Sequence, residues 1–371
     1  MNKILPFSLH TLIFHVTKAC NLKCSHCWQR SEPKGSDNKV IEEHEDISSL
    51  KYADILNTAK GLGLKCVKFT GGEPFLHPEV WDYLDITNKN DLSIIIETNG
   101  TLLDKIQIKR LKALNRLELS VSLDGTTPLT HDRFRGVDGA YNLTISALEL
   151  LAQFEIPVQI IMCLYRENMD ELDELLRIAD DFKVKSVKIN PIQPIGRGQD
   201  FIDKEGYLSI CELLDISDEL KKGRRQDFSG DIHFSLPLAF KPLSEIIDKK
   251  YSLCRIFHIL GLLPNGYISF CGIGNIEQSA IIGNIFSDRI DDLWQNAPLL
   301  LELRKRLPSK LKGICSYCIF KAVCLGECRA SAYNMTGDLM APFWICQKAY
   351  EEGLFPQSRL NMSQGKPGDI C

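Results

Sequence analysis

The chain has 371 residues, of which 44% are hydrophobic and 25% charged, and its formal net charge is −4. This length predicts about two domains. The charge lacks the basic surplus of a nucleic-acid-binding protein, so we expect no nucleic-acid partner. No apolar run approaches the roughly 20 residues of a membrane span. Residues 1–10 lack the basic region and apolar core of a signal peptide, and we expect a cytoplasmic protein with no membrane partner.

Short apolar runs rich in β-branched residues alternate with stretches of helical periodicity in the first half of the chain. Six βα units in series predict a parallel sheet. Six strands are too few to close an eight-stranded barrel, so the expected fold class is α/β, a partial (β/α)6 TIM-like barrel. A doubly wound sheet is the alternative, which periodicity alone does not exclude. Strands are predicted at residues 12–16, 66–70, 92–98, 116–123, 158–163 and 186–191, and helices at 48–61, 141–154 and 168–181.

The regular alternation of predicted strands and helices ends after the sixth predicted strand. We expect the barrel to occupy residues 1–200 and a connector with a helix-like stretch at 204–222 to occupy 201–250. A cysteine-rich region of short elements follows at 251–350, and Asn265-Gly266 predicts a hairpin turn within it because this pair tolerates positive φ. Residues 351–371 are expected to form a C-terminal tail, whose polar end, 363–371, is predicted to be mobile.

Cysteine is over-represented, with 14 residues that cluster in the sequence. Without a secretion signal, such clusters are more often metal or iron–sulfur ligands than disulfides. Cys20, Cys24 and Cys27 form C-x3-C-x2-C directly after the first predicted strand. A [4Fe–4S] cluster normally takes four cysteines, so three would leave one iron open to a ligand. A zinc knuckle completed by His26 is the alternative.

This cysteine loop resembles the signature of the radical S-adenosylmethionine (SAM) superfamily. The resemblance implies that the open iron binds the amino and carboxylate groups of SAM, and that an electron from the cluster cleaves SAM to a 5′-deoxyadenosyl radical. It also implies that His26 packs near the adenine of SAM, whereas an ordinary surface histidine is the alternative.

A glycine pair and a carboxylate follow the second predicted strand. Gly71 and Gly72 would let the backbone approach a ligand closely, and Glu73 could accept hydrogen bonds from an ammonium group. The segment resembles the superfamily motif that holds the amino group of SAM. Its position, one βα unit after the cysteine loop, strengthens the interpretation.

Polar residues also end the third and fourth predicted strands, at the edge of a parallel sheet where ligands bind. Asn99 ends the third, and Ser122 and Asp124 end the fourth. The resemblance implies that Ser122 contacts SAM and that Asp124 supports this contact, although Asp124 could simply form a turn. Either Arg133 or Arg135 could neutralise the SAM carboxylate, and we favour Arg135.

Three residues at later strand ends are weaker candidates. Gln193 follows the sixth predicted strand and is included among the SAM-binding candidates, although a loop glutamine is the alternative. Asn168 follows the fifth and fits a helix cap better. Cys163 is predicted to end the fifth strand, where its thiol could donate a hydrogen atom to a substrate radical, with core packing as the alternative.

Seven further cysteines resemble in order and spacing the SPASM domain, a C-terminal extension found in many radical SAM enzymes. The resemblance implies two auxiliary iron–sulfur clusters, expected to be [4Fe–4S], beside the radical SAM cluster and SAM. A pair of zinc sites is the alternative, since C-x2-C also suits zinc. The implied inner cluster has only three evident ligands, so its site is either open or completed by another residue. The outer-cluster ligands are Cys315, Cys318, Cys324 and Cys346, and the inner-cluster ligands are Cys254, Cys271 and Cys328.

The resemblance spans nearly the whole chain and predicts an enzyme that abstracts hydrogen from a ribosomally made peptide or protein, for crosslinking, epimerisation or oxidation. A reductant such as flavodoxin or ferredoxin is the expected protein partner. Gly272 stands where anaerobic sulfatase-maturating enzymes have an aspartate base, which argues against formylglycine formation. A tetrapyrrole-modifying enzyme of haem biosynthesis is the alternative, and a non-catalytic iron–sulfur electron carrier is a further one.

Overall fold

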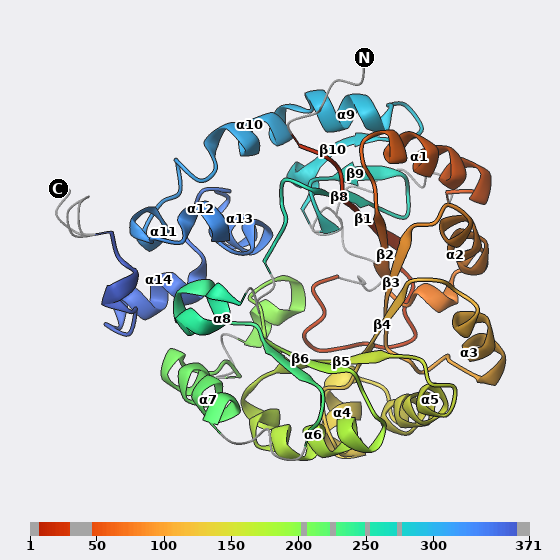
Figure 1. Ribbon diagram of the computed structural model, residues 1–371, viewed down its shortest axis with the longest axis horizontal. Helices are drawn as coiled ribbons and strands as arrows, with labels where there is room; N and C mark the ends of the chain where they lie inside the picture. The colour runs from red at the N-terminus through yellow and green to blue at the C-terminus, as the bar shows by residue number, and fades with distance from the viewer. Residues whose placement is uncertain are drawn as a thin grey trace.

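The computed structural model describes residues 7–29, 47–201, 206–222, 228–248, 253–272 and 277–361. Within these residues the strands form one curved sheet in the order β10-β9-β8-β1-β2-β3-β4-β5-β6-β7 (Figure 1). Strands β1 to β7 are parallel to their neighbours and β8 runs parallel to β1, whereas β9 and β10 are antiparallel. The strands are β1 Thr11–Thr17, β2 Cys66–Gly71, β3 Ser93–Thr98, β4 Leu117–Ser122, β5 Val158–Leu164, β6 Ser186–Pro191, β7 Asp231–Phe234, β8 Ile259–Leu262, β9 Tyr267–Ser269 and β10 Ile281–Asn284.

Helices α1, α2, α3, α5 and α6 cover the convex side of this sheet, which identifies a partial barrel and not a doubly wound sheet, whereas the short α4 lies against the first cysteine loop (Figure 1). All six predicted strands and the three predicted helices of the barrel are confirmed. Local signals explain the helix ends: Ser48 accepts a hydrogen bond from Lys51 N at 3.3 Å, and Gly136 ends its helix at φ 72°. The helices are α1 Ser49–Gly61, α2 Val80–Lys89, α3 Lys105–Lys112, α4 Pro128–Arg135, α5 Ala140–Gln153 and α6 Leu172–Asp181.

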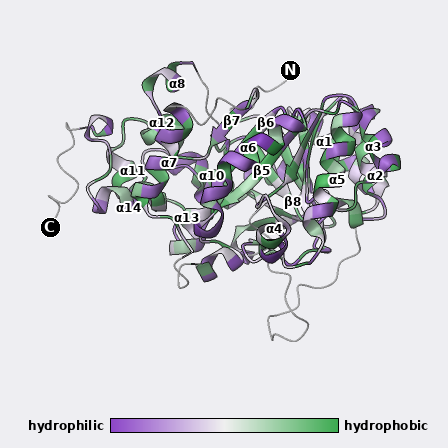
Figure 2. Cartoon of the chain, turned by 90° about the horizontal axis from the view of Figure 1, so that it is seen from below, coloured by the Kyte–Doolittle hydropathy of each residue, from purple (hydrophilic) through white to green (hydrophobic). Residues whose placement is uncertain are grey.

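Alternate strand residues form the core between sheet and helices. Leu12, Phe14, Val67 and Phe69 are at most 1% exposed and pack against the surrounding helices. The strands are mostly hydrophobic and the helices are mixed, as expected of amphipathic helices around a buried sheet (Figure 2). The intervening strand residues face the interior of the barrel, where polar side chains gather.

Two parallel strands extend the sheet beyond the six predicted ones. β7 lies inside the expected connector and pairs with β6, while β8 comes from the cysteine-rich region and pairs with β1. Each has only four residues, too few for a periodic pattern to be recognised in the sequence. The connector also contains α7 Ile210–Lys222 and α8 Leu243–Ile247.

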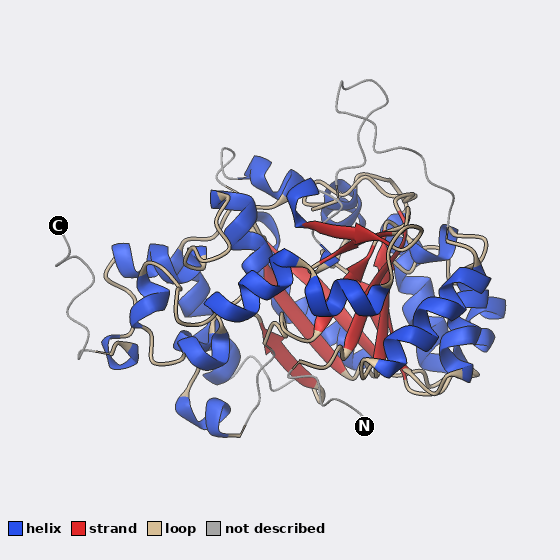
Figure 3. Cartoon of the chain, turned by 90° about the horizontal axis from the view of Figure 1, so that it is seen from above, coloured by secondary structure: helices blue, strands red, loops and turns tan. Residues whose placement is uncertain are grey.

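The cysteine-rich region beside the barrel consists mainly of short helices (Figure 3). The predicted hairpin turn is confirmed, with Gly266 at φ 79° between β8 and β9. Within the expected tail, Phe355 is buried and Leu360 forms a β-bridge with Cys318, while the predicted mobile end, 363–371, lies outside the described residues. No described helix combines the length and apolarity needed to cross a bilayer. The helices are α9 Ile290–Asn296, α10 Pro298–Arg306, α11 Ile314–Tyr317, α12 Lys321–Cys324, α13 Arg329–Thr336 and α14 Trp344–Glu351.

Candidate functional site

The first cysteine loop crosses the carboxyl-terminal mouth of the barrel and is attached to it mainly by backbone hydrogen bonds. The end of α4 accepts two of them, from Lys23 N to Arg135 O and from Ser25 N to Phe134 O, both 2.9 Å. On the other side, Arg197 N donates to Cys27 O at 3.0 Å. Neighbouring elements therefore help to set the positions of the predicted ligands Cys24 and Cys27.

The glycine pair after β2 brings the turn at Glu73 against this loop. Gly72 N donates to Thr17 O at 2.8 Å, and Glu73 N donates to Ala19 O at 2.9 Å. A Cβ on Gly72 would lie 2.0 Å from Ala19 O, which no side chain could tolerate. The glycines thus serve the close approach of two backbone segments, a reason that the sequence alone did not reveal.

Glu73 is fully buried at the mouth of the barrel. It accepts hydrogen bonds from Thr98 Oγ1 at 2.7 Å, from Asn99 N at 2.9 Å and from Phe75 N at 3.3 Å. Burial raises the pKa of Glu73 to about 7, although these donors oppose the rise. Asn99 also donates to Asn21 Oδ1 at 3.0 Å, which ties the end of β3 to the cysteine loop.

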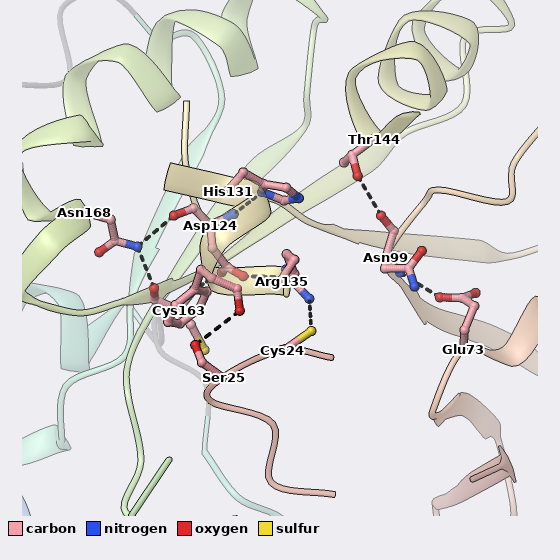
Figure 4. Close-up of polar contacts among 11 residues, drawn as sticks. Cys24, Ser25, Glu73, Asn99, Asp124, His131, Arg135, Thr144, Cys163 and Asn168 are labelled. Carbon is pink, nitrogen blue, oxygen red and sulfur yellow. Dashed lines mark hydrogen bonds and ion pairs between the residues drawn. The ribbon is translucent and has the colours of Figure 1, made fainter. Parts of the chain in front are cut away.

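A second polar group, contributed by α4, β4 and β5, adjoins Cys24 (Figure 4). Arg135 Nη2 pairs with Asp124 Oδ2 at 2.5 Å, and its Nη1 donates to Cys24 Sγ at 3.6 Å. Asp124 also accepts from Cys163 N at 2.7 Å. Burial raises the pKa of the Cys24 thiol, while the Arg135 guanidinium lowers it and so favours the thiolate that binds iron.

An aromatic stack lies beside the third cysteine. His26 stacks on Phe134 at 4.2 Å between ring centroids, and Phe134 stacks on Tyr165 at 4.3 Å. Among the described residues, the buried Nδ1 atom of His26 has no hydrogen-bond partner. A buried nitrogen without a hydrogen-bond partner lowers the stability of the fold unless a ligand supplies that partner. The ring nitrogens and amino group of an adenine are of the chemical type that could partner this atom.

The three thiols of the loop fit an iron–sulfur ligand set. Burial raises the pKa of Cys20 to about 11, and the neighbouring Cys24 and Cys27 raise it further, so the three groups interact electrostatically. All described cysteines are free thiols. No three histidine, cysteine or acidic side chains among the described residues are arranged to hold a single metal ion.

The remaining SAM-binding candidates differ in their burial and in the residues that they contact. Ser122 ends β4 and is half-buried. Asn168 donates to Asp124 O at 2.8 Å and to Cys163 O at 2.9 Å, which braces the ends of β4 and β5. Gln193 accepts from Trp344 Nε1 at 3.1 Å and donates to Pro191 O at 3.1 Å, so it joins the end of β6 to α14. Their contacts with SAM stay predictions.

Charged side chains that the sequence analysis did not single out occupy the barrel interior. Lys68 on β2 pairs with Glu97 on β3 at 2.6 Å, and Thr70 donates to Glu97 at 3.2 Å. The side chains of Lys68 and Glu97 are 29% and 30% exposed to solvent, so this pair borders accessible space. Lys188 on β6 interacts electrostatically with Lys68 and with Glu97. Its pKa is lowered mainly by burial and also by the positive charge of Lys68. Two ammonium groups thus lie near Glu97, and the Glu327 carboxylate also interacts electrostatically with Lys188.

The signal for these residues was present but weak. Lys68 and Lys188 each stand between buried strand residues, such as Val67 and Phe69 or Val187 and Ile189. A lysine alternating with apolar residues normally indicates a solvent-facing strand surface. Only the curvature of the sheet shows that this polar face is the inside of a barrel.

The four predicted outer-cluster ligands line one pocket in the C-terminal region. Cys315, Cys318, Cys324 and Cys346 all border it, together with apolar groups that include Phe355. Burial raises the pKa of Cys346 well above its usual value, and the three other thiols raise it further. Four converging thiols in an apolar pocket fit an iron–sulfur cluster.

The predicted inner-cluster ligands comprise an interacting pair, Cys254 and Cys328, and Cys271, whose neighbour Gly272 packs against the first cysteine loop. Cys254 and Cys328 interact electrostatically, and burial raises the pKa of Cys254 to about 12. Cys271 follows β9, and a Cβ on its neighbour Gly272 would lie 2.5 Å from His15 Nε2 and 3.0 Å from the Trp28 ring. Packing therefore explains the glycine at position 272, where an aspartate would not fit without rearrangement.

Two family models match the chain. The Radical SAM superfamily model matches residues 14–179, and a model described as an iron–sulfur cluster-binding domain, SPASM, matches residues 254–319. The two matched segments contain all the predicted cysteine ligands except Cys324, Cys328 and Cys346, which lie on the C-terminal side of the second segment.

Relatives of different activity match almost the full length. The AdoMet-dependent heme synthase of Methanosarcina barkeri (strain Fusaro / DSM 804) is 26% identical over 89% of this chain and 93% of its own. The mycofactocin maturase MftC of Mycobacterium ulcerans (strain Agy99) is 27% identical over 95% of this chain and 94% of its own. The crystal structure of Streptococcus suis SuiB bound to precursor peptide SuiA has the same fold, with TM-score 0.71 at 18% identity, over 93% of this chain and 77% of that one.

Proposed function

The chain is a radical SAM enzyme with a C-terminal SPASM domain, and we propose that it modifies a ribosomally made peptide or protein. The observation that carries this proposal is the likeness to a maturase along 95% of the chain, in a molecule that has a SAM-type cysteine loop and further converging thiols. A simple electron carrier would not need the buried Glu73 and His26 groups at the barrel mouth.

The geometry supports a role for each mouth residue. Cys20, Cys24 and Cys27 would hold the cluster, and Glu73 would accept the amino group of SAM. Arg135 keeps a donor for the SAM carboxylate, because its Nε atom has no hydrogen-bond partner among the described residues. When bound, the cluster and SAM together supply a 5′-deoxyadenosyl radical that abstracts a hydrogen atom from the substrate. A one-electron reductant such as flavodoxin or ferredoxin would supply the electron.

The barrel interior indicates which part of a substrate enters it. Lys68 pairs with Glu97, whereas Lys188 interacts electrostatically with Glu97 and Glu327 and forms no direct ion pair among the described residues. A carboxylate of the substrate, from an acidic side chain or a peptide C-terminus, would balance the remaining ammonium group. Cys163 lies in the same interior, and burial raises its pKa, so its thiol stays protonated as a hydrogen-atom donor must be.

A second candidate function is the modification of a tetrapyrrole. The likeness to the haem synthase of Methanosarcina barkeri, which covers 93% of that relative, favours it. The propionates of a tetrapyrrole would also pair with Lys188. The two candidates therefore share the recognised group and differ in the molecule that carries it.

The test uses the full chain, reconstituted anaerobically with iron and sulfide, with SAM and a strong reductant. Formation of 5′-deoxyadenosine is expected, and its absence from fully loaded protein would refute the radical SAM assignment. Peptides encoded beside the gene are then compared with a propionate-bearing tetrapyrrole. Loss of hydrogens from a peptide, or uptake of deuterium from D₂O, supports the peptide proposal. Turnover of the tetrapyrrole alone would replace it with the second candidate.

A further inference from the structure

A buried guanidinium lies between the two cysteine groups of the C-terminal region. Arg329 begins α13 directly after Cys328, and its side chain is 0% exposed. Burying a charge costs several kcal/mol unless it is compensated. Within the part of the chain that the structure describes, Arg329 forms no direct ion pair with a carboxylate, although the nearby Glu327 interacts with it electrostatically. The rest of its compensation comes from other groups.

Backbone carbonyls provide part of this compensation. Arg329 Nη1 donates to Leu339 O at 2.9 Å and to Ala341 O at 2.7 Å, and Nη2 donates to Gly326 O. These bonds join the segment between α13 and α14 to the loop between Cys324 and Cys328. The close approach requires glycine at 326, where a Cβ would lie 2.4 Å from Nη2.

Cysteines of both proposed ligand sets also lie within electrostatic reach of this guanidinium. The side chain of Arg329 interacts electrostatically with Cys315 and Cys324, which belong to the proposed outer ligand set, and with Cys254 and Cys328, which belong to the inner set. Its Nε atom is buried and has no hydrogen-bond partner among the described residues. One guanidinium with one remaining donor therefore adjoins both sets, together with the Glu327 carboxylate.

We propose that Arg329 is a positioning residue shared by the two auxiliary clusters. Its Nη bonds hold together the two segments that flank the ligands, and its Nε–H remains as a donor to a cluster sulfur. Hydrogen bonds to sulfur and nearby charge both set the potential of an iron–sulfur cluster. Because a positive charge stabilises the reduced, more negative cluster, Arg329 would raise the reduction potentials of both. The inference rests on the proposed SPASM ligands, and not on the identity of the substrate.

The test measures the auxiliary clusters alone. In a Cys20→Ala, Cys24→Ala, Cys27→Ala background, Arg329→Lys keeps the charge and loses the planar fork, whereas Arg329→Met removes the charge at similar length. Arg306→Met is the matched control, since Arg306 is an exposed cation of the same region that pairs with Glu302. Iron content and EPR-monitored redox titrations are recorded for each variant.

Arg329→Met is expected to shift both auxiliary potentials to more negative values, Arg329→Lys to shift them less, and Arg306→Met to leave them unchanged. If Arg329→Met does not retain iron, the Arg329→Lys potentials decide the matter. Full iron with unchanged potentials in the Arg329 variants would overturn the proposal, as would a shift of one cluster only. These measurements involve neither SAM nor a peptide, so failure of the peptide proposal would leave their outcome unaffected.

Discussion

The two cysteine regions of this molecule are supported in different ways. The loop with Cys20, Cys24 and Cys27 lies outside the main apolar core of the barrel, and Cys24 packs only in a small separate cluster with Leu22 and Ala140. In the C-terminal region, the thiols of Cys315 and Cys346 are themselves part of the buried core. The helices there include α11 and α12, of four residues each, which are too short to be stable alone.

This difference indicates that the first cluster is added to a finished scaffold, whereas the auxiliary clusters help to build theirs. Metal binding to a site that is not preformed contributes directly to folding free energy. Loss of iron should therefore have different consequences in the two regions. The predictions below test that contrast.

The largest effect is expected from replacing the three loop cysteines. Cys20→Ala, Cys24→Ala, Cys27→Ala should lower SAM cleavage by at least about a thousandfold, since the reaction then loses its electron source. The melting temperature should stay nearly unchanged because backbone bonds hold the loop. Product chromatography and calorimetry measure both, with Cys211→Ala, at an exposed cysteine of α7, as the control. A large loss of stability would contradict the finished-scaffold interpretation.

Replacement of an outer ligand should instead affect folding of one region. Cys315→Ala is expected to release auxiliary iron and to speed proteolysis after residue 253 about tenfold or more, which corresponds to ~1.4 kcal/mol. Protection of the barrel should persist. Hydrogen exchange resolved by peptide would show where the loss of protection begins. Equal amide protection of the C-terminal region with and without iron would contradict the proposed difference between the two regions.

Glu73→Gln should weaken SAM binding by about 10- to 100-fold, because a hydrogen bond to a charged group contributes about 1.5–3 kcal/mol. The pKa of Glu73 is raised to about 7 mainly by burial, and only its ionised form attracts the ammonium group of SAM. Affinity should thus rise with pH up to about 7 and level off above it. Calorimetric titration at several pH values checks this, and Glu73→Gln should lose the dependence. A pH-independent wild type would refute the assignment.

Lys188→Met should raise the KM of the substrate that the activity assay identifies by about tenfold, the effect of losing one charged contact. SAM cleavage without substrate should be unaffected, since Lys188 lies below the mouth of the barrel. Lys185→Met, at an exposed position before the same strand, is the control. An unchanged KM with a changed melting temperature would assign Lys188 a structural role only.

The smallest effect concerns the junction of the two regions. Gly272→Ala places a Cβ 2.5 Å from His15 Nε2 and should destabilise the protein by about 1–3 kcal/mol. Gly61→Ala, where nothing lies within 4 Å of the added Cβ, should be nearly neutral. Thermal unfolding compares the two, and equal melting temperatures would show that the junction has more room than its packing indicates.

The sequence by itself determined the six strands, the cysteine groups and the turn at Glu73. Each of these is a local pattern, either an apolar period along a few residues or a fixed spacing of thiols, so neighbours in the chain suffice to specify it. The hairpin at Gly266 was predictable for the same reason.

The tertiary structure alone decided how these pieces meet. Arg135 could be favoured from the sequence, but its hydrogen bond to Cys24 joins positions that are 111 residues apart. The inward direction of Lys188 depends on the curvature of the whole sheet. The position of Arg329 between two thiol sets depends on the return of α14 against α11. Such contacts arise from packing between distant segments, for which no local pattern in the chain exists.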